Sequence, residues 1–93
     1  MIEFTEYIID LTDVYNADEL QNIIEEVLPV PGYYGRNLDA LFDVLTEEAD
    51  GWDITFKGCS DAEVTMGKYM RKLRQLCEDA QNMNDRLRVS FED

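Results

Sequence analysis

The sequence predicts an α/β fold: a small three-stranded parallel sheet packed with about four helices. Segments typical of strands alternate with segments typical of helices in the order strand, helices, strand, helices, strand. This is the pattern of a parallel sheet with right-handed crossovers. The 93 residues suit one domain spanning 1–93, with a modest core. Apolar residues make up 45% of the chain, which is too many for a disordered protein.

Residues 2–10 are predicted to form the first strand. Phe4 and Ile8 are the candidates for one face, and Tyr7 and Ile9 for the other. Because a run that is apolar on both faces is typical of a strand covered on each side, we expect this strand at the centre of the sheet.

The first helix is predicted to follow a turn at Asp13 and Asn16. Asn16 and Glu19 have the spacing of a capping box, in which each side chain accepts a hydrogen bond from the other residue's backbone. Apolar residues then recur with the helical period, at Leu20, Ile23, Ile24, Val27 and Leu28. Pro29 and Pro31 end this helix.

The second helix follows Gly35, which favours a turn, and Asn37, a good N-cap. Its apolar side would face the core and carries Leu38, Leu41, Phe42, Leu45 and Ala49. A neighbouring stripe is mostly acidic and holds Asp39, Asp43, Thr46 and Asp50, with Glu47 at its edge. Asp39 and Asp43 are like charges four residues apart, which destabilises a helix by roughly a few tenths of a kcal/mol. A positively charged partner gives a reason for this pair; the alternative is an ordinary solvated helix face.

A second strand is predicted over residues 52–57, where polar residues alternate with Trp52, Ile54 and Phe56. Gly58 closes this strand, and Ser60 is expected to cap a short helical piece that ends at Val64. The longer helix that follows would bury Met66, Met70, Leu73, Leu76, Cys77 and Ala80. We expect a break or bend near Gly67. Residues 82–85 form a turn, and the last strand alternates Leu87, Val89 and Phe91.

The charge is uneven along the chain. The net charge is −13; residues 1–56 hold 14 acidic residues and one basic residue, Arg36, whereas residues 57–93 hold seven of each. Such acidity argues against nucleic acid as a partner, since phosphates are bound by Lys and Arg. It favours capture of a cationic protein, which salt would weaken; the alternative is that the acidity only aids solubility.

Little in the sequence indicates an enzyme. There is no histidine, the commonest general base near neutral pH, and no Gly-rich phosphate loop. Cys59 and Cys77 do not make a metal motif, and we expect them to be reduced packing residues of a cytoplasmic protein. No apolar run has the length of a membrane helix, and the N-terminus does not read as a signal peptide. Neither a metal nor a cofactor is expected.

Three aromatic residues border the acidic stripe: Tyr33, Tyr34 and Phe42. Aromatic side chains beside charges are common at hot spots of protein interfaces. The alternative places Phe42 and at least one of the tyrosines in the core. We expect Tyr33 to be exposed and Tyr34 to be buried.

The segment YYGRNLDALFDVLT at residues 33–46 resembles the signature of the barstar family, intracellular inhibitors of secreted barnase-type ribonucleases. That signature reads Tyr-Tyr-Gly-x-Asn-Leu-Asp-Ala-Leu-Trp-Asp, followed shortly by Leu-Thr. Phe42 stands where the family has Trp. Outside this motif the similarity lies in the order and length of the elements. The resemblance implies a barstar-like fold, in which a three-stranded parallel sheet packs with helices.

The resemblance also implies a function. Members of the family plug the ribonuclease active site with the acidic helix and the loop before it, and their carboxylates occupy the positions of RNA phosphates. The residues implied to bind the partner are Tyr33, Asp39, Phe42, Asp43, Thr46 and Glu47, with Glu78 or Asp79 as a peripheral contact. The implied partner is one basic ribonuclease per chain, and we expect a monomer when the protein is free.

Two departures from the family bear on the identity of the partner. Glu47-Glu48 replaces a Gly-Trp pair, and Arg36 puts a positive charge where the inhibitor that names the family carries an acid. Either change is compatible with a different target nuclease, or with a relative that inhibits none. The alternative function is therefore an acidic adaptor of the same fold that binds another basic protein.

Overall fold

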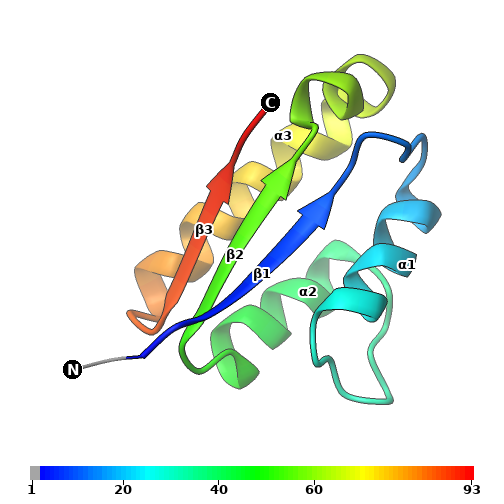
Figure 1. The fold of residues 1–93 in the computed structure, drawn as a ribbon. Coiled ribbons are helices and arrows are strands. Elements are labelled where there is room, and N and C mark those ends of the chain that lie inside the picture. Colours follow the sequence, from blue (N-terminus) through cyan, green and yellow to red (C-terminus); the bar gives the residue numbers. More distant parts are fainter. Residues whose placement is uncertain (1–2) are drawn as a thin grey trace.

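A computed structural model describes residues 3–93. Its elements are β1 (Thr5–Asp10), α1 (Ala17–Val27), α2 (Leu38–Asp43), the π-helical segment η1 (Val44–Glu48), β2 (Trp52–Lys57), α3 (Cys59–Met83) and β3 (Leu87–Phe91). The strands form a parallel sheet in the order β1-β2-β3 (Figure 1). The predicted α/β class and the three-stranded parallel sheet are therefore confirmed.

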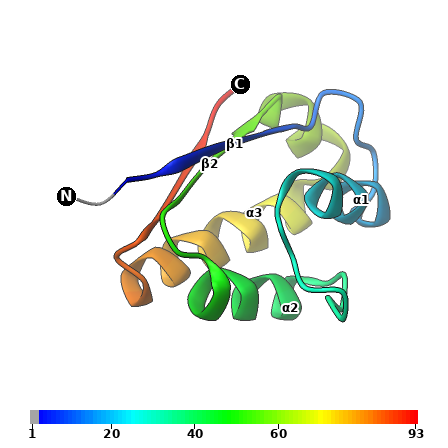
Figure 2. The ribbon, with the colours of Figure 1, turned by 60° about the horizontal axis from the view of Figure 1, so that its bottom comes forward.

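The helices in this part of the chain all lie on one side of the sheet (Figure 2). On the covered face, Ile54 and Phe56 of β2 and Ile9 of β1 are buried, whereas Ile8 on the opposite face is 47% exposed. The prediction of a central first strand covered on both faces is thus wrong, because β1 lies at the edge of the sheet. Phe4, on the open face, packs under the guanidinium of Arg88, whose carbon lies 3.9 Å from the ring centroid. Within the described residues the strand begins at Thr5; Ile2 lies outside them.

The first helix begins and ends where its capping residues predict. The Asn16 side chain accepts a hydrogen bond from the backbone N–H of Glu19 at 2.9 Å. In a standard capping box the Glu19 carboxylate would accept a hydrogen bond from the backbone N–H of the N-cap residue, Asn16. Here it accepts from the N–H of Tyr15, one residue earlier. Among the predicted inner residues, Leu20, Ile24 and Leu28 are buried, which confirms the amphipathic pattern.

The last helix is one kinked element rather than two helices. Met66 has non-helical dihedral angles (φ −135°, ψ 40°), which confirms the bend expected near Gly67. The helix begins directly after Gly58, so Ser60 lies inside it and is not its N-cap. Gly58 has a left-handed φ of +72°, and a Cβ there would lie 2.7 Å from the hydroxyl of Thr12. Because the short and long pieces run on as α3, there are three α-helices in the described residues instead of about four.

The core lies between the covered face of the sheet and the three helices. Fully buried side chains from every layer meet there, including Leu20, Leu41, Ile54, Phe56 and Leu73. Cys59 and Cys77 are free and buried, and burial raises the pKa of the Cys77 thiol to about 12. None of the helices in residues 3–93 has both the length and the apolar character that crossing a membrane requires.

Candidate functional site

The acidic helix consists of two segments with different hydrogen-bond patterns. The side chain of Asn37 accepts from the N–H of Ala40 at 2.7 Å, so α2 begins at Leu38, as its N-cap predicts. After Asp43 the chain widens into η1, where the N–H of Ala49 donates to the carbonyl of Val44, five residues earlier. The sequence pattern predicts one regular helix here, and its last turn is in fact π-helical. π-helical turns are rare in proteins, and those that occur are often found at functional sites.

Asn84, in the turn between α3 and β3, holds the end of η1. Its side-chain amide donates to the carbonyls of Leu45 and Ala49, each at 2.8 Å. Its Oδ1 accepts from the backbone N–H of Arg86 at 3.0 Å. Carbonyls at a helix end have no partner inside the helix. A residue far away in the sequence therefore satisfies the end of the acidic helix and fixes its position.

The π-helical turn changes which acids share a surface. Because its backbone hydrogen bonds span five residues instead of four, residue i+5 lies nearer to the side of residue i than in an α-helix. Glu48 accordingly lines the same surface hollow as Asp43 and Glu47. Asp50, predicted on the stripe, pairs instead with Arg86. Glu48 was missed as a site residue because the regular helical period does not place it beside Asp43. The departure of Glu47-Glu48 from the family's Gly-Trp pair is the signal that could have indicated it.

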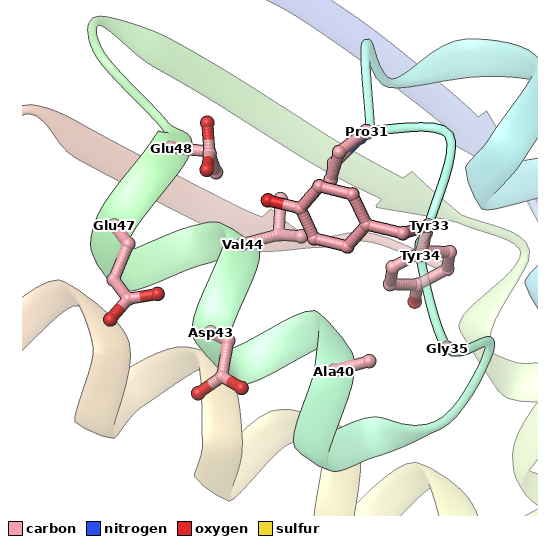
Figure 3. Close-up of a pocket in the computed structure, with 9 residues that line it drawn as sticks. All are labelled: Pro31, Tyr33, Tyr34, Gly35, Ala40, Asp43, Val44, Glu47 and Glu48. Atoms are coloured by element: carbon pink, nitrogen blue, oxygen red, sulfur yellow. The ribbon is translucent and has the colours of Figure 1, made fainter.

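The first hollow, of about 300 Å³, lies between η1 and the loop that precedes α2. Asp43, Glu47 and Glu48 line its helix side, and the ring of Tyr33 extends from the loop toward that helix (Figure 3). Tyr33 is 82% exposed and Tyr34 only 8%. The predicted exposure of the first tyrosine and burial of the second are both confirmed.

The second hollow, of about 470 Å³, lies between α2 and α3. Asp39, Phe42 and Asp43 line its α2 side, and α3 contributes Lys72 and Asp79. Asp43 therefore borders both hollows. Lys72 was not singled out in the sequence, and its position beside two predicted acids follows from the packing of α3 against α2.

Two of the predicted site residues line neither hollow. Thr46 donates its hydroxyl hydrogen to the carbonyl of Phe42 at 2.8 Å, a bond within the helix backbone. Glu78 is exposed on α3, whereas its neighbour Asp79 lines the second hollow and accepts from Gln75 at 3.0 Å. Of the two alternatives for a peripheral contact, Asp79 is the one that shares a hollow with other predicted residues.

Arg36 is turned away from the acids of α2. Its backbone is left-handed (φ 58°), a conformation expected of a turn glycine such as Gly35. Its guanidinium forms ion pairs with Asp18, at 2.8 Å, and Glu25, both on α1, and donates to Asn22 at 2.7 Å. The positive charge that sets this chain apart from the inhibitor that names the family is thus compensated by α1.

Within residues 3–93, the carboxylates at the two hollows form no ion pair with a basic side chain. The ion pairs within residues 3–93 involve none of Asp39, Asp43, Glu47 and Glu48. Nor does this part of the chain hold three or more His, Cys, Asp or Glu side chains arranged to bind a metal ion. Chemically, the site can accept hydrogen bonds from cationic groups over a continuous surface flanked by Tyr33 and Phe42.

Comparison with known proteins agrees with this fold and motif. A family model described as Barstar (barnase inhibitor) matches residues 4–92. The chain is also similar to a protein of Bacillus subtilis (strain 168) named "Putative ribonuclease inhibitor YrdF". The two are 32% identical over 91 residues, which is 91% of this chain and 96% of that protein. The match spans nearly the whole chain and includes the helix that carries the unpaired carboxylates, so this protein belongs to the barstar family.

Proposed function

We propose that the protein is a stoichiometric inhibitor of a basic, barnase-type ribonuclease, and that it covers the enzyme's active site with α2, η1 and the preceding loop. The observation that carries this proposal is that Asp39 and Asp43 form no ion pair among the described residues and that Asp43 borders both the hollow of Asp39 and the hollow of the exposed Tyr33. A basic active site supplies the missing cations. Family membership and the ribonuclease-inhibitor name of the Bacillus subtilis relative support the same function.

The proposed inhibition is a substitution of carboxylates for phosphates. A ribonuclease holds RNA phosphates with cationic side chains, and carboxylates form similarly strong charge-assisted hydrogen bonds with Arg and Lys. Asp43 borders both hollows and takes the central position in the phosphate-binding pocket. Asp39 lies one helical turn earlier and contacts a neighbouring cation. The inhibitor carries no bond that the enzyme could cleave.

Aromatic and peripheral contacts complete the proposed interface. Tyr33 projects from the loop and packs on the enzyme, as exposed aromatic side chains do at interface hot spots. Phe42 supplies an apolar surface beside the acids, and Glu47 and Thr46 contribute at the end of the helix. On α3, Asp79 is better placed than Glu78 for the peripheral contact, because Asp79 shares the second hollow with Asp39.

A calorimetric titration against a barnase-type ribonuclease, at low and at high salt, tests the proposal. We expect one-to-one binding that weakens as salt rises, because salt screens attraction between exposed charges beyond a Debye length of about 10 Å at 0.1 M. Ribonuclease activity should be abolished at an equimolar dose. Absence of binding at either salt concentration would contradict the proposal. A basic protein other than a nuclease would then be the partner to seek by pull-down from the host, as expected for an acidic adaptor.

A further inference from the structure

A glutamine lies buried behind the loop that presents Tyr33. Gln21 of α1 is 1% exposed, and it is the one polar or charged residue among the buried residues of the described chain. Its amide nitrogen donates to the hydroxyl of Tyr69 on α3 at 2.9 Å. Its amide oxygen accepts from the hydroxyl of Tyr34 in the loop. Since a buried amide is costly unless hydrogen-bonded, the position of Gln21 is tied to both tyrosines.

The hydrogen-bond chain runs from the Tyr34 hydroxyl through the Gln21 amide to the Tyr69 hydroxyl. Burial, and to a lesser extent the neighbouring phenol of Tyr69, raise the pKa of Tyr34, so its hydroxyl keeps the proton that it donates to Gln21. No buried side-chain nitrogen or oxygen in residues 3–93 lacks a hydrogen-bond partner. Removing the Gln21 amide would therefore leave two hydroxyls, on two different elements, without the partner that joins them.

Tyr33 depends on its neighbours for its position. Its side chain is 82% exposed and has little packing of its own. Tyr34, the next residue, is anchored inward through its hydroxyl, and its backbone N–H donates to the carbonyl of Pro31 at 3.0 Å. Beyond Gly35, Arg36 holds the loop to the outside of α1 through Asp18, Asn22 and Glu25. The loop is thus fastened to α1 at two points on the C-terminal side of Tyr33.

We propose that Gln21 is a positioning residue of the partner-binding surface: through Tyr34 it fixes the loop so that Tyr33 is held in its binding position before the partner arrives. The effect on affinity rests on the proposed function, whereas the effect on the loop does not. An interface that is ordered in advance loses less conformational entropy on binding. Loosening the loop should therefore weaken the complex without removing any direct contact.

The test compares Gln21→Leu with Gln81→Leu in ribonuclease binding. Gln81 is a matched control, because this part-buried glutamine also joins two elements: it donates to the carbonyl of Cys77 at 3.2 Å and accepts from the N–H of Val89 at 3.0 Å. It lies at the α3–β3 contact, away from the loop. We expect Gln21→Leu to raise the dissociation rate about tenfold, the fold-change that about 1.4 kcal/mol produces, and Gln81→Leu to leave it unchanged.

A double-mutant cycle separates positioning from general destabilisation. If Gln21 acts through Tyr33, the tenfold effect of Gln21→Leu on affinity should largely disappear in a Tyr33→Ala background. It should persist in full in an Asp39→Ala background. An effect of equal size in both backgrounds would overturn the proposal. Tyr34→Phe keeps the ring and removes only the hydroxyl, so it repeats the test in a variant with minimal change in core volume.

A second measurement needs no ribonuclease. Amide hydrogen exchange followed by NMR should show faster exchange of the Tyr34 amide in Gln21→Leu and Tyr34→Phe than in the unmodified protein and in Gln81→Leu. Unchanged exchange in both loop variants would overturn the positioning role, whether or not a ribonuclease binds. Faster exchange in a chain that binds no ribonuclease would support the positioning role while contradicting the proposed function.

Discussion

The acidic residues of this protein fall into two groups that the fold treats differently. Four acids outside the candidate site carry ion pairs, which join Asp18 and Glu25 to Arg36, Glu63 to Arg74, and Asp50 to Arg86. At the two hollows, Asp39, Asp43, Glu47 and Glu48 take part in none of the ion pairs among the described residues. The nearest base in the sequence, Arg36, is held on α1 instead.

Arg36 lies next to the acidic helix in the sequence, but the fold pairs it with Asp18 and Glu25 of α1, so the acidic helix keeps its charge. Exposed ion pairs add little to stability, typically about 0–1 kcal/mol, so the pairs elsewhere do not explain the fold. What they do is engage Arg36, Arg74 and Arg86 with acids outside α2 and η1, so that the carboxylates of these two segments stay available to a partner. The acids of the site remain available to a partner. The cost is a small loss of helix stability, because like charges four residues apart, such as Asp39 and Asp43, repel each other.

The largest expected effect comes from removing the acid that borders both hollows. Asp43→Ala should weaken ribonuclease binding by roughly 100-fold or more, because a cation left unpaired in a desolvated interface costs about 3–5 kcal/mol. The stability of the free protein should change little. Calorimetry measures the affinity, and circular dichroism checks the fold.

The matched control for this prediction is Glu92→Ala, which removes an equal charge from an exposed position beyond β3. It should lower the affinity only slightly, through the long-range field. If the two substitutions weakened binding equally, bulk charge rather than the acidic helix would be responsible for binding.

A smaller effect is expected at the end of the site helix. Asn84→Ala removes both hydrogen bonds to the carbonyls of Leu45 and Ala49, which should lower the free energy of unfolding by about 1–3 kcal/mol. It should also loosen the turn that places Glu47 and Glu48 beside Asp43. Urea denaturation measures the stability.

Asn82→Ala is the control for this helix-end prediction, because Asn82 is an exposed residue in the last turn of α3, two positions before Asn84. It should have nearly wild-type stability. Equal stability of the two variants would mean that the Asn84 amide does not hold η1.

Local features of the fold and the site could be predicted from the sequence. Asn16 and Asn37 cap their helices through bonds to residues three positions away, and the alternation in residues 52–57 is visible within one short segment. These features depend on neighbours within a few residues, which a sequence pattern records.

The features that sequence reasoning missed depend on distant residues. The π-helical turn is held by Asn84, which lies 39 residues from Leu45, and the partners of Arg36 lie up to 18 residues away on α1. The open face beside Ile8 depends on which side of the sheet the helices cover. No periodicity within β1 or α2 contains that information, so the strand was assigned to the sheet centre and Glu48 was missed.

The smallest predicted effect concerns the one cation among the residues that line the two hollows, Lys72. Its charge lies beside Asp39 and Asp43 and would oppose the approach of a basic enzyme. Lys72→Ala should therefore tighten ribonuclease binding about twofold, as an exposed charge contribution of roughly 0.5 kcal/mol implies.

The control is Lys68→Ala, which removes an exposed lysine of α3 that lines neither hollow. This substitution should change the affinity less than Lys72→Ala does. The gain should shrink at high salt, because the interaction is screened. Weaker binding by Lys72→Ala would mean that this lysine contacts an acid of the partner, and the enzyme surface facing α3 would then be mixed in charge rather than uniformly basic.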